Sequence, residues 1–189
     1  MPLKLLAISG SARKNSLNAR LLAAAVNSAR TLGAEVTVLN LRALALPIYD
    51  GDLEESSGLP AGCLALKQAL SEHAALLVAS PEYNGFFSPL LKNALDWASR
   101  PQPGKTSPFA GQVAALLAAA PGGLGGIRGL PALRQLLSNL GVLVTPGQMS
   151  LPNAGEAFEA TGKLANAAQQ QMLEKVVADL LLTAQALRR

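Results

Sequence analysis

Apolar residues along the chain follow two kinds of pattern. Short continuous runs predict buried strands, and they lie at residues 3–9, 35–39, 74–79, 112–119 and 142–144. Between these runs, apolar residues return every three or four positions, which predicts amphipathic helices. The chain is therefore expected to alternate strand and helix five times.

Glycine, proline and serine mark where several predicted helices begin and end. The first helix is expected from Leu17 to just before Gly33, because glycine readily takes the conformation that follows a helix. Pro89 and Pro131 open two further helices, since proline is tolerated in a first turn, and Ser88 is the expected N-cap of the first of them.

Two segments complete the predicted order of elements. Residues 47–60 are rich in glycine, proline and acids, which predicts a surface loop, and a helix then continues to about Ser71. The chain closes with a helix over 164–187, whose buried stripe is expected at Leu164, Ala168, Met172, Val176 and Leu180.

Strict alternation of strands and helices predicts an α/β fold with one domain over residues 1–189. Each right-handed crossover lays a helix on one face of a parallel sheet, so a doubly wound five-stranded sheet of order 2-1-3-4-5 is expected. In such sheets, ligands bind beyond the carboxyl ends of the strands near the switch point of the strand order. The loops that follow Ser9, Ala79 and Ala119 are therefore the candidate site.

The loop after the first strand contains groups that bind phosphate. Gly10 allows a sharp turn, and the hydroxyls of Ser11 and Ser16 and the amide of Asn18 can donate hydrogen bonds to phosphate oxygens. The unpaired N–H groups at the start of the next helix favour an anion, and Arg13 adds a positive charge. The alternative is that a residue such as Ser16 merely caps the helix.

The loop over residues 80–89 has the composition of a platform for a flat ring. Its aromatic side chains beside a glycine can form a shelf, and Asn84 offers both a donor and an acceptor. Pro81 and Gly85 would hold the backbone against the edge of a heterocycle. The alternative is that these aromatic residues belong to the core.

The third loop, residues 120–126, is rich in glycine and permits a close backbone approach at the same end of the sheet. Gly122 is its expected contact with a ligand, although a flexible turn is an equal alternative. The spacing of Gly123, Gly125 and Gly129 is GxGxxxG, and the loop follows the fourth strand. It therefore differs from the dinucleotide-binding GxGxxG, which opens its fold.

Composition excludes several classes of function. The formal net charge of +4 comes from scattered Lys and Arg, which argues against a nucleic-acid partner. Cys63 is the only cysteine and His73 the only histidine of the chain. The residues needed for a disulfide framework, a zinc site or a Cys-His dyad are therefore not all present, and no metal is expected. One unpaired thiol fits a reducing cytoplasm, and no apolar run has the ~20 residues that would span a membrane.

Taken together, the loops resemble the NADPH-dependent FMN reductase family, whose flavodoxin-like members include quinone, chromate and azo-dye reductases. The segment GSARKNSLN at Gly10 is similar to the family's phosphate loop GSxRxxSxN. The segment SPEYNGFFSPLLKNALDW at Ser80 is similar to its PEYN flavin segment and the helix after it. The similarity covers most of the chain and weakens after about Pro146. Related reductases often have a serine near the ring, where this chain has Ala119 and Ala120.

The resemblance implies which residues hold FMN. Around its phosphate it places Ser11, Arg13, Ser16, Leu17 and Asn18. Beside its isoalloxazine ring it places Pro81, Glu82, Tyr83, Asn84 and Gly85, with Ser88 and Gly122 completing the expected cofactor-binding set.

The function expected from this resemblance is electron transfer from NADPH or NADH, through FMN, to a quinone or a similar small acceptor such as chromate or an azo dye. The chemistry belongs to the flavin, so no catalytic side chain is named. One alternative is a flavin reductase with FMN as a diffusing substrate, and another is an FMN-binding electron shuttle without turnover. A homodimer or homotetramer is expected, because such assemblies are common among related reductases.

Overall fold

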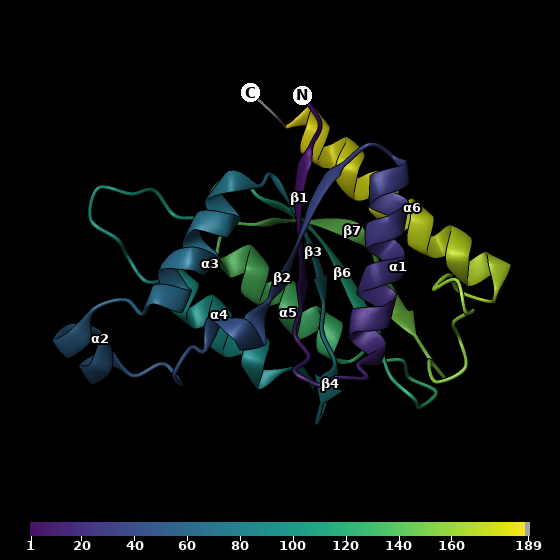
Figure 1. Cartoon of the computed structure of the whole chain (residues 1–189), viewed down its shortest axis with the longest axis horizontal. Helices are drawn as coiled ribbons and strands as arrows, with labels where there is room; N and C mark the ends of the chain where they lie inside the picture. Colours follow the sequence, from purple (N-terminus) through teal and green to yellow (C-terminus); the bar gives the residue numbers. More distant parts are fainter. Residues whose placement is uncertain (188–189) are drawn as a thin grey trace.

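The computed structural model describes residues 1–187 and contains a five-stranded parallel sheet of order β2-β1-β3-β6-β7 (Figure 1). This order is the predicted 2-1-3-4-5, so the expectation of a flavodoxin-like sheet is confirmed. The strands in chain order are β1 (Lys4–Ser9), β2 (Glu35–Asn40), β3 (Ala75–Ala79), β6 (Val113–Ala119) and β7 (Leu143–Leu151).

Helices cover both faces of the sheet because successive side chains of a strand point to opposite faces. In β1, Leu5 and Ala7 pack in the cluster beneath α1 (Leu17–Thr31) and α6 (Ala167–Ala186). Leu6 and Ile8 point the other way. The helices on that second face are α3 (Ala61–Glu72), α4 (Pro89–Ser99) and α5 (Gly129–Asn139). Every residue of β3 and β6 is buried, which explains why both read as continuous apolar runs.

The buried stripe of α6 differs from the predicted one. Met172 is half exposed and Ala168 is exposed, whereas the buried residues are Leu173, Val176, Val177, Leu180 and Ala184. A row of residues spaced four apart drifts by about 40° per step around a helix of 3.6 residues per turn. Within α6 the predicted row therefore left the buried face at its N-terminal end, while Leu164 is buried as predicted but precedes the helix.

The last strand is longer than predicted. It was expected at 142–144, but β7 continues to Leu151 through Pro146 and Gly147, with a register shift opposite Ala114 and Leu116. Proline is tolerated here because β7 lies at the edge of the sheet. The guanidinium of Arg134 donates to the carbonyls of Val144 and Thr145 at 3.2 and 2.8 Å, and to that of Pro146 at 3.4 Å.

The segment predicted as a surface loop over 47–60 contains a short helix, α2 (Gly51–Ser57), and a 3-10 turn, η1 (Leu41–Leu44), precedes it. The Asp50 carboxylate caps α2 by accepting from the N–H groups of Asp52 and Leu53. The acidic residues of this segment therefore lie at the N-terminus of a surface helix, where they are favoured by the helix dipole. The prediction of a loop was wrong over these seven residues.

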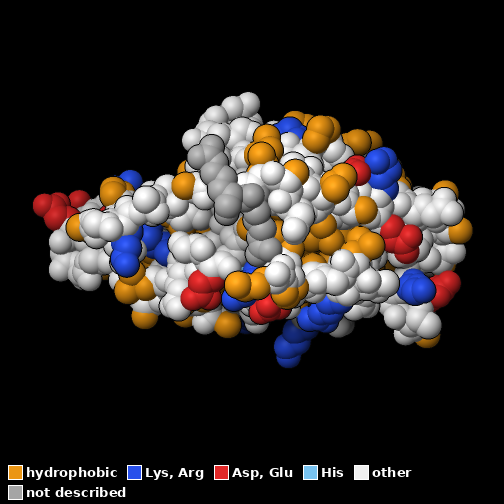
Figure 2. Space-filling view, turned by 90° about the horizontal axis from the view of Figure 1, so that it is seen from above, with side chains coloured by type: hydrophobic (Ala, Val, Ile, Leu, Met, Phe, Trp, Pro, Cys, Tyr) orange, Lys and Arg blue, Asp and Glu red, His pale blue; other side chains and the backbone are white. Residues whose placement is uncertain are grey.

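The surface of the described residues carries charges of both signs. In the view from above, Lys and Arg side chains are interspersed with Asp and Glu, and hydrophobic side chains line a hollow in the middle of the face (Figure 2). No helix within residues 1–187 is long and apolar enough to cross a membrane.

Candidate functional site

The loops that follow β1, β3 and β6 meet at the carboxyl edge of the sheet, as expected from the switch point of the strand order. Residues of all three loops line a cavity of about 100 Å³. Its lining consists of Ser11, Arg13, Ser16, Leu17, Asn18, Pro81, Glu82, Tyr83, Ala119, Ala120 and Pro121. The structure therefore brings together most of the predicted residues, while Asn84, Gly85, Ser88 and Gly122 lie outside this lining.

The first loop leads from β1 into the N-terminus of α1. Ser16 is the N-cap of α1, and its hydroxyl oxygen accepts from the N–H of Ala19 at 3.1 Å. The first turn of α1 contains no acidic side chain, which leaves the N-terminus of this helix favourable to an anion. Arg13 lies exposed beside it. Ser16 thus caps the helix and also lines the cavity, so its role as a cap does not prevent it from contacting a phosphate.

Gly10 is required for close packing and not for a special backbone angle. Its φ is outside the left-handed region, but a Cβ at this position would lie 2.8 Å from the Ser88 Oγ and 3.2 Å from the Leu91 Cβ. The Ser88 hydroxyl donates to the Gly10 carbonyl at 2.6 Å and accepts from the Leu91 N–H at 3.2 Å. The missing side chain of Gly10 therefore lets the first loop rest on the start of α4.

Ser88 does not line the cavity. It is 1% exposed, and both its donor and one acceptor position are used in the contacts with Gly10 and Leu91. Its predicted role as N-cap of α4 is confirmed. In place of the predicted contact with a cofactor, the Ser88 hydroxyl holds the first loop against the start of α4.

Asn18 clamps the first loop to the third. Its amide NH₂ donates to the Ala119 carbonyl at 2.8 Å, and its amide oxygen accepts from the Ala119 N–H at 2.9 Å. The side chain is buried, so both bonds are shielded from water. The predicted donation from Asn18 to phosphate therefore competes with a contact that fixes the end of β6.

The second loop forms a tight hairpin of β4 (Glu82–Tyr83) and β5 (Phe86–Phe87). Asn84 and Gly85 form its two-residue turn with φ values of 53° and 81°, the combination that a type I′ turn requires. Asn-Gly between short aromatic segments is a strong hairpin signal that our reading of the sequence missed. Asn84 and Gly85 consequently stand at the tip of the hairpin, while Pro81, Glu82 and Tyr83 line the cavity.

The hairpin places two aromatic side chains at the surface beside the cavity. Tyr83 is 46% exposed and Phe86 is 56% exposed, whereas Phe87 is buried against α5. Phe87 and Trp97 are core residues, as the alternative interpretation held, whereas the ring platform stays a prediction for Tyr83 and Phe86. The exposed pair leaves an apolar surface at the mouth of the site.

The third loop contributes backbone to the cavity through Ala119, Ala120 and Pro121. Gly122 is exposed and outside the lining, and its carbonyl accepts from the N–H groups of Gly125 and Asn153. Gly122 therefore lies at a turn next to the lining residue Pro121, and its contact with a cofactor stays a prediction.

These residues fit the phosphate end and one ring edge of FMN. A helix N-terminus, two serine hydroxyls and one arginine suit a phosphate, and exposed aromatic residues suit a flat ring. The cavity is smaller than the ~300–1,000 Å³ of sites that enclose a ligand. Within one chain it would therefore enclose only part of the cofactor.

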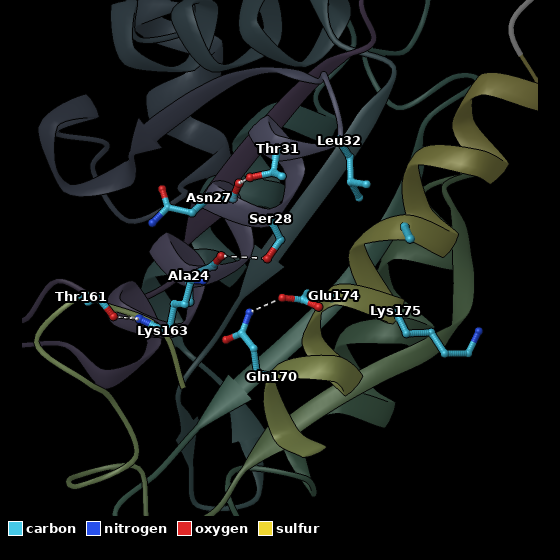
Figure 3. Close-up of a pocket in the computed structure, with 11 residues that line it drawn as sticks. Ala24, Asn27, Ser28, Thr31, Leu32, Thr161, Lys163, Gln170, Glu174 and Lys175 are labelled. Carbon is cyan, nitrogen blue, oxygen red and sulfur yellow. Dashed lines mark hydrogen bonds between the residues drawn. The ribbon is translucent and has the colours of Figure 1, made fainter. Parts of the chain in front are cut away.

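Larger cavities are not lined by all three loops. One of about 510 Å³ runs between the C-terminal half of α1 and α6 (Figure 3). Its charged residues are Lys163, Glu174 and Lys175, and Lys175 is paired with Asp179 at 2.9 Å. It is remote from the carboxyl ends of the strands, so we assign the site to the smaller cavity.

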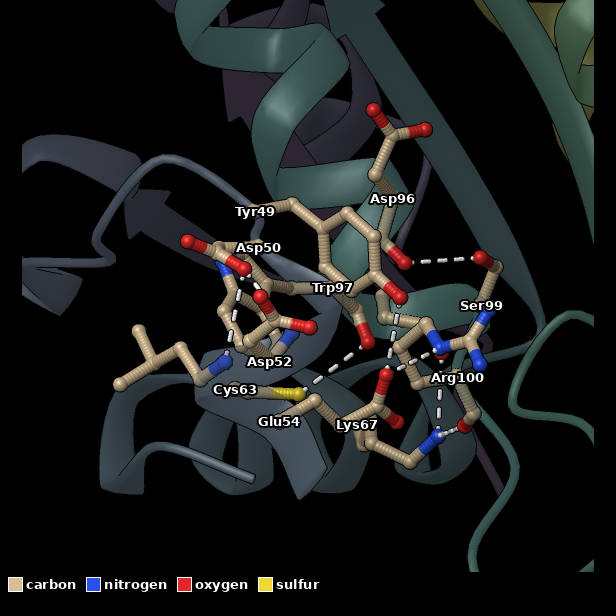
Figure 4. Close-up of polar contacts among 12 residues, drawn as sticks. Tyr49, Asp50, Asp52, Glu54, Cys63, Lys67, Asp96, Trp97, Ser99 and Arg100 are labelled. Carbon is tan, nitrogen blue, oxygen red and sulfur yellow. Dashed lines mark hydrogen bonds and ion pairs between the residues drawn. The ribbon is translucent and has the colours of Figure 1, made fainter. Parts of the chain in front are cut away.

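A second polar cluster joins α2, α3 and α4 on the far side of the sheet (Figure 4). Glu54 accepts from the Tyr49 hydroxyl at 2.9 Å and pairs with Arg100 at 2.7 Å. The ammonium of Lys67 donates to the carbonyl of Ala98 at 3.0 Å, and burial lowers its pKa. These contacts fasten α2 and the end of α4 to the body of the protein.

Cys63 lies in the same cluster and is fully buried, with its thiol donating to the Trp97 carbonyl at 3.2 Å. His73 is also buried and contacts Thr37 and the Ala69 carbonyl. Among residues 1–187, no group of three His, Cys, Asp or Glu side chains is arranged to hold a metal. Cys63 and His73 are therefore buried residues of the packed interior.

Burial raises the pKa of the Cys63 thiol above its ordinary value of 9.0. The thiol therefore loses its proton at lower pH in the unfolded chain than in the folded one. The contribution of the buried, protonated thiol to folding stability is complete below pH 9.0. It is lost as the pH rises through the pKa of the folded state. We expect the difference in unfolding free energy between the wild type and Cys63→Ala to shrink above that pH. Urea titrations under reducing conditions would measure it, and a constant difference would contradict the assignment.

Comparison with known proteins connects this geometry to a family. The model of the family described as NADPH-dependent FMN reductase matches residues 3–156. An NAD(P)H-dependent FMN reductase of Pseudomonas aeruginosa is 33% identical over 187 residues, covering 98% of this chain and 97% of that protein. An NADPH:quinone oxidoreductase of Arabidopsis thaliana is 34% identical over 185 residues, covering 94% and 90% of the two chains.

A solved structure agrees with these relatives. FerB of Paracoccus denitrificans, a flavoenzyme NAD(P)H:(acceptor) oxidoreductase, superposes with a TM-score of 0.85 at 26% identity. The superposition covers 97% of this chain and 98% of FerB.

Proposed function

Because this chain belongs to the NADPH-dependent FMN reductase family and is an FMN oxidoreductase driven by NAD(P)H, we propose that the three loops at the carboxyl edge of its sheet form the FMN site. The observation that carries the proposal is the convergence of these loops on one cavity at the N-terminus of α1. The acceptor we propose is a quinone or a similar small molecule, by analogy with the quinone oxidoreductases among its relatives.

At the phosphate end, we propose that Ser11, Arg13 and Ser16 bind the phosphate together with the N–H groups of the first turn of α1. Leu17 lines the same cavity, and the Asn18 clamp supports the proposal by holding this turn against the end of β6. Hydrogen bonds to an ionised group contribute roughly 1.5–3 kcal/mol each, so two or three of them, added to the contacts of the ring, suffice for micromolar binding.

At the ring end, Pro81, Glu82 and Tyr83 would border the isoalloxazine from one side. When bound, FMN supplies the hydride and electron chemistry. The chain's own contribution is to orient the ring and to keep one of its faces accessible, and the small cavity beside exposed Tyr83 and Phe86 supports this role. NAD(P)H and the acceptor would then use the same open face in turn.

We propose that a second copy of the chain completes this site, as a homodimer or within a homotetramer. The hairpin tip and the third loop expose apolar side chains around the small cavity, namely Tyr83, Phe86, Leu124 and Ile127. A partner surface over them would enclose more of the cofactor than one chain does. The single free thiol suits action in the cytoplasm.

An absorbance spectrum of the purified protein tests the proposal directly. We expect a flavin band that bleaches when NADPH or NADH is added without air and returns when a quinone is added. A colourless protein that regains the band with added FMN would indicate that FMN is a diffusing substrate. A protein that binds FMN but does not oxidise NAD(P)H would be an electron shuttle, and failure to bind FMN at all would overturn the proposal.

Replacing Arg13 by alanine is expected to weaken FMN binding by roughly ten- to a hundredfold, the contribution of one charge-assisted contact. The fold should not change, because Arg13 is exposed. Quenching of flavin fluorescence on titration measures the dissociation constant. Arg30→Ala is the matched control, since it removes an exposed arginine from the other end of α1. Equal affinities of the two variants would refute the assignment of Arg13.

A further inference from the structure

Glu82 joins the hairpin of the second loop to the start of α5. One carboxylate oxygen lies 2.6 Å from the Arg128 guanidinium Nη2 and 2.7 Å from its Nε. The other accepts from the backbone N–H of Arg128 at 2.9 Å and from that of Gly129 at 3.3 Å. The Glu82 side chain is 7% exposed, whereas that of Arg128 is 62% exposed.

This contact supplies a cap that α5 lacks in its own sequence. The N-cap residue of α5 is Arg128, whose side chain makes no capping hydrogen bond. The carboxylate of Glu82, from a loop 46 residues earlier, accepts from the unpaired N–H groups instead. A carboxylate at a helix N-terminus is favoured by the helix dipole as well as by these hydrogen bonds.

Close packing holds the same two loops together. A Cβ at Gly126 would lie 2.9 Å from the Ala118 Cβ and 3.7 Å from the Glu82 Cβ, and one at Gly129 would lie 3.2 Å from the carbonyl carbon of Phe86. The hairpin therefore rests directly on the third loop. Glu82 also lines the cavity that we assign to FMN, so its charge lies at the edge of that site.

We infer that the Glu82–Arg128 pair tunes the bound flavin, an inference that rests on the proposed function. Glu82 is a positioning residue that fixes the ring-binding hairpin on α5, and Arg128 cancels the negative charge that Glu82 would otherwise exert on the cofactor. Charges near the ring change the reduction potential of a flavin, because reduction adds electrons to it.

Two single substitutions should shift the potential in opposite directions. Arg128→Ala leaves the Glu82 carboxylate without its guanidinium partner, which disfavours reduced FMN and makes the midpoint potential more negative. Glu82→Gln leaves the guanidinium without its counter-charge, which makes the potential more positive. The double variant should lie between them, and Arg128→Lys should stay close to the wild type because it keeps the charge.

The experiment is a reductive titration of the FMN-loaded full-length protein and its variants against a reference dye. Asp179→Ala is the control, because it breaks the Lys175 ion pair on α6 far from the loops and should not change the potential. Since the Arg128 side chain is largely exposed, its variants test the inference even if Glu82→Gln does not fold.

A purely structural role for the pair would loosen FMN in both single variants without shifts of opposite sign, and that result would overturn the inference. If Glu82→Gln does not fold, an unchanged potential in Arg128→Ala would overturn it as well. The proposed function would survive either outcome as long as the wild type takes up FMN. A wild type that takes up none would overturn both.

Discussion

Asn18→Ala is expected to lower the free energy of unfolding by about 2–6 kcal/mol, because it leaves two buried backbone groups unpaired at ~1–3 kcal/mol each. These groups are the N–H and the carbonyl of Ala119, which now bond the Asn18 amide at 2.9 and 2.8 Å. Alanine is no worse than asparagine inside a helix, so helix propensity cannot explain the loss. Urea unfolding followed by circular dichroism measures it.

Two further variants serve as comparisons for Asn18→Ala. Asn27→Ala makes the same replacement at an exposed position on the same helix, and it should change stability little. Asn18→Asp keeps the acceptor for the Ala119 N–H but loses the donor to its carbonyl and buries a carboxylate, so it should be at least as damaging. If Asn18→Ala were as stable as Asn27→Ala, the clamp would not contribute to stability.

The same substitution should also weaken FMN binding. Ala119 lines the cavity on the side of the third loop, and the Asn18 amide is its connection to the first turn of α1. Releasing this connection lets the two loops separate, so the phosphate and ring contacts are no longer held in register. A loss of affinity in a variant that still folds would distinguish this positioning role from stability alone.

Gly125→Ala is expected to destabilise the protein by about 2–5 kcal/mol, from the left-handed backbone angle and from overpacking together. The φ of Gly125 is 61°, and a Cβ there would lie 2.6 Å from the Pro152 nitrogen and 2.7 Å from the Leu151 carbonyl carbon. Both atoms belong to backbone, so the end of β7 would have to move.

Gly122→Ala is the matched control for this prediction. Gly122 lies three residues earlier in the same loop, its φ is not in the left-handed region, and a Cβ there would meet nothing within 4 Å. Thermal unfolding of the two variants should show a large decrease in melting temperature for Gly125→Ala and little change for Gly122→Ala. Similar melting temperatures would show that the loop is free to rearrange.

Features that depend on local pattern could be predicted from the sequence. The order of the sheet, the three loops and the caps at Ser88 and Gly33 follow from apolar spacing and from the residue types at element ends. The length of β7 could not be read in this way, because Pro146 is compatible with a strand only at a sheet edge. Edge position is a property of the assembled sheet.

The roles of several site residues depend on partners far along the chain. Asn18 bonds a residue 101 positions away, Ser88 one 78 positions away, and Glu82 one 46 positions away. The sequence showed that each of these side chains could donate or accept a hydrogen bond near a ligand. It did not show that protein groups already bond these side chains, so their role in holding the loops together could not be predicted.

The contact of Arg134 with the edge of β7 bears on aggregation. An edge strand with a regular row of free backbone groups can recruit a strand from another molecule and begin a cross-β assembly. In β7, the register shift interrupts that row, Pro146 removes an N–H, and the guanidinium occupies three consecutive carbonyls. This edge is thereby protected against templated pairing with a second molecule, although the inner strands β3 and β6 of the same sheet are entirely apolar.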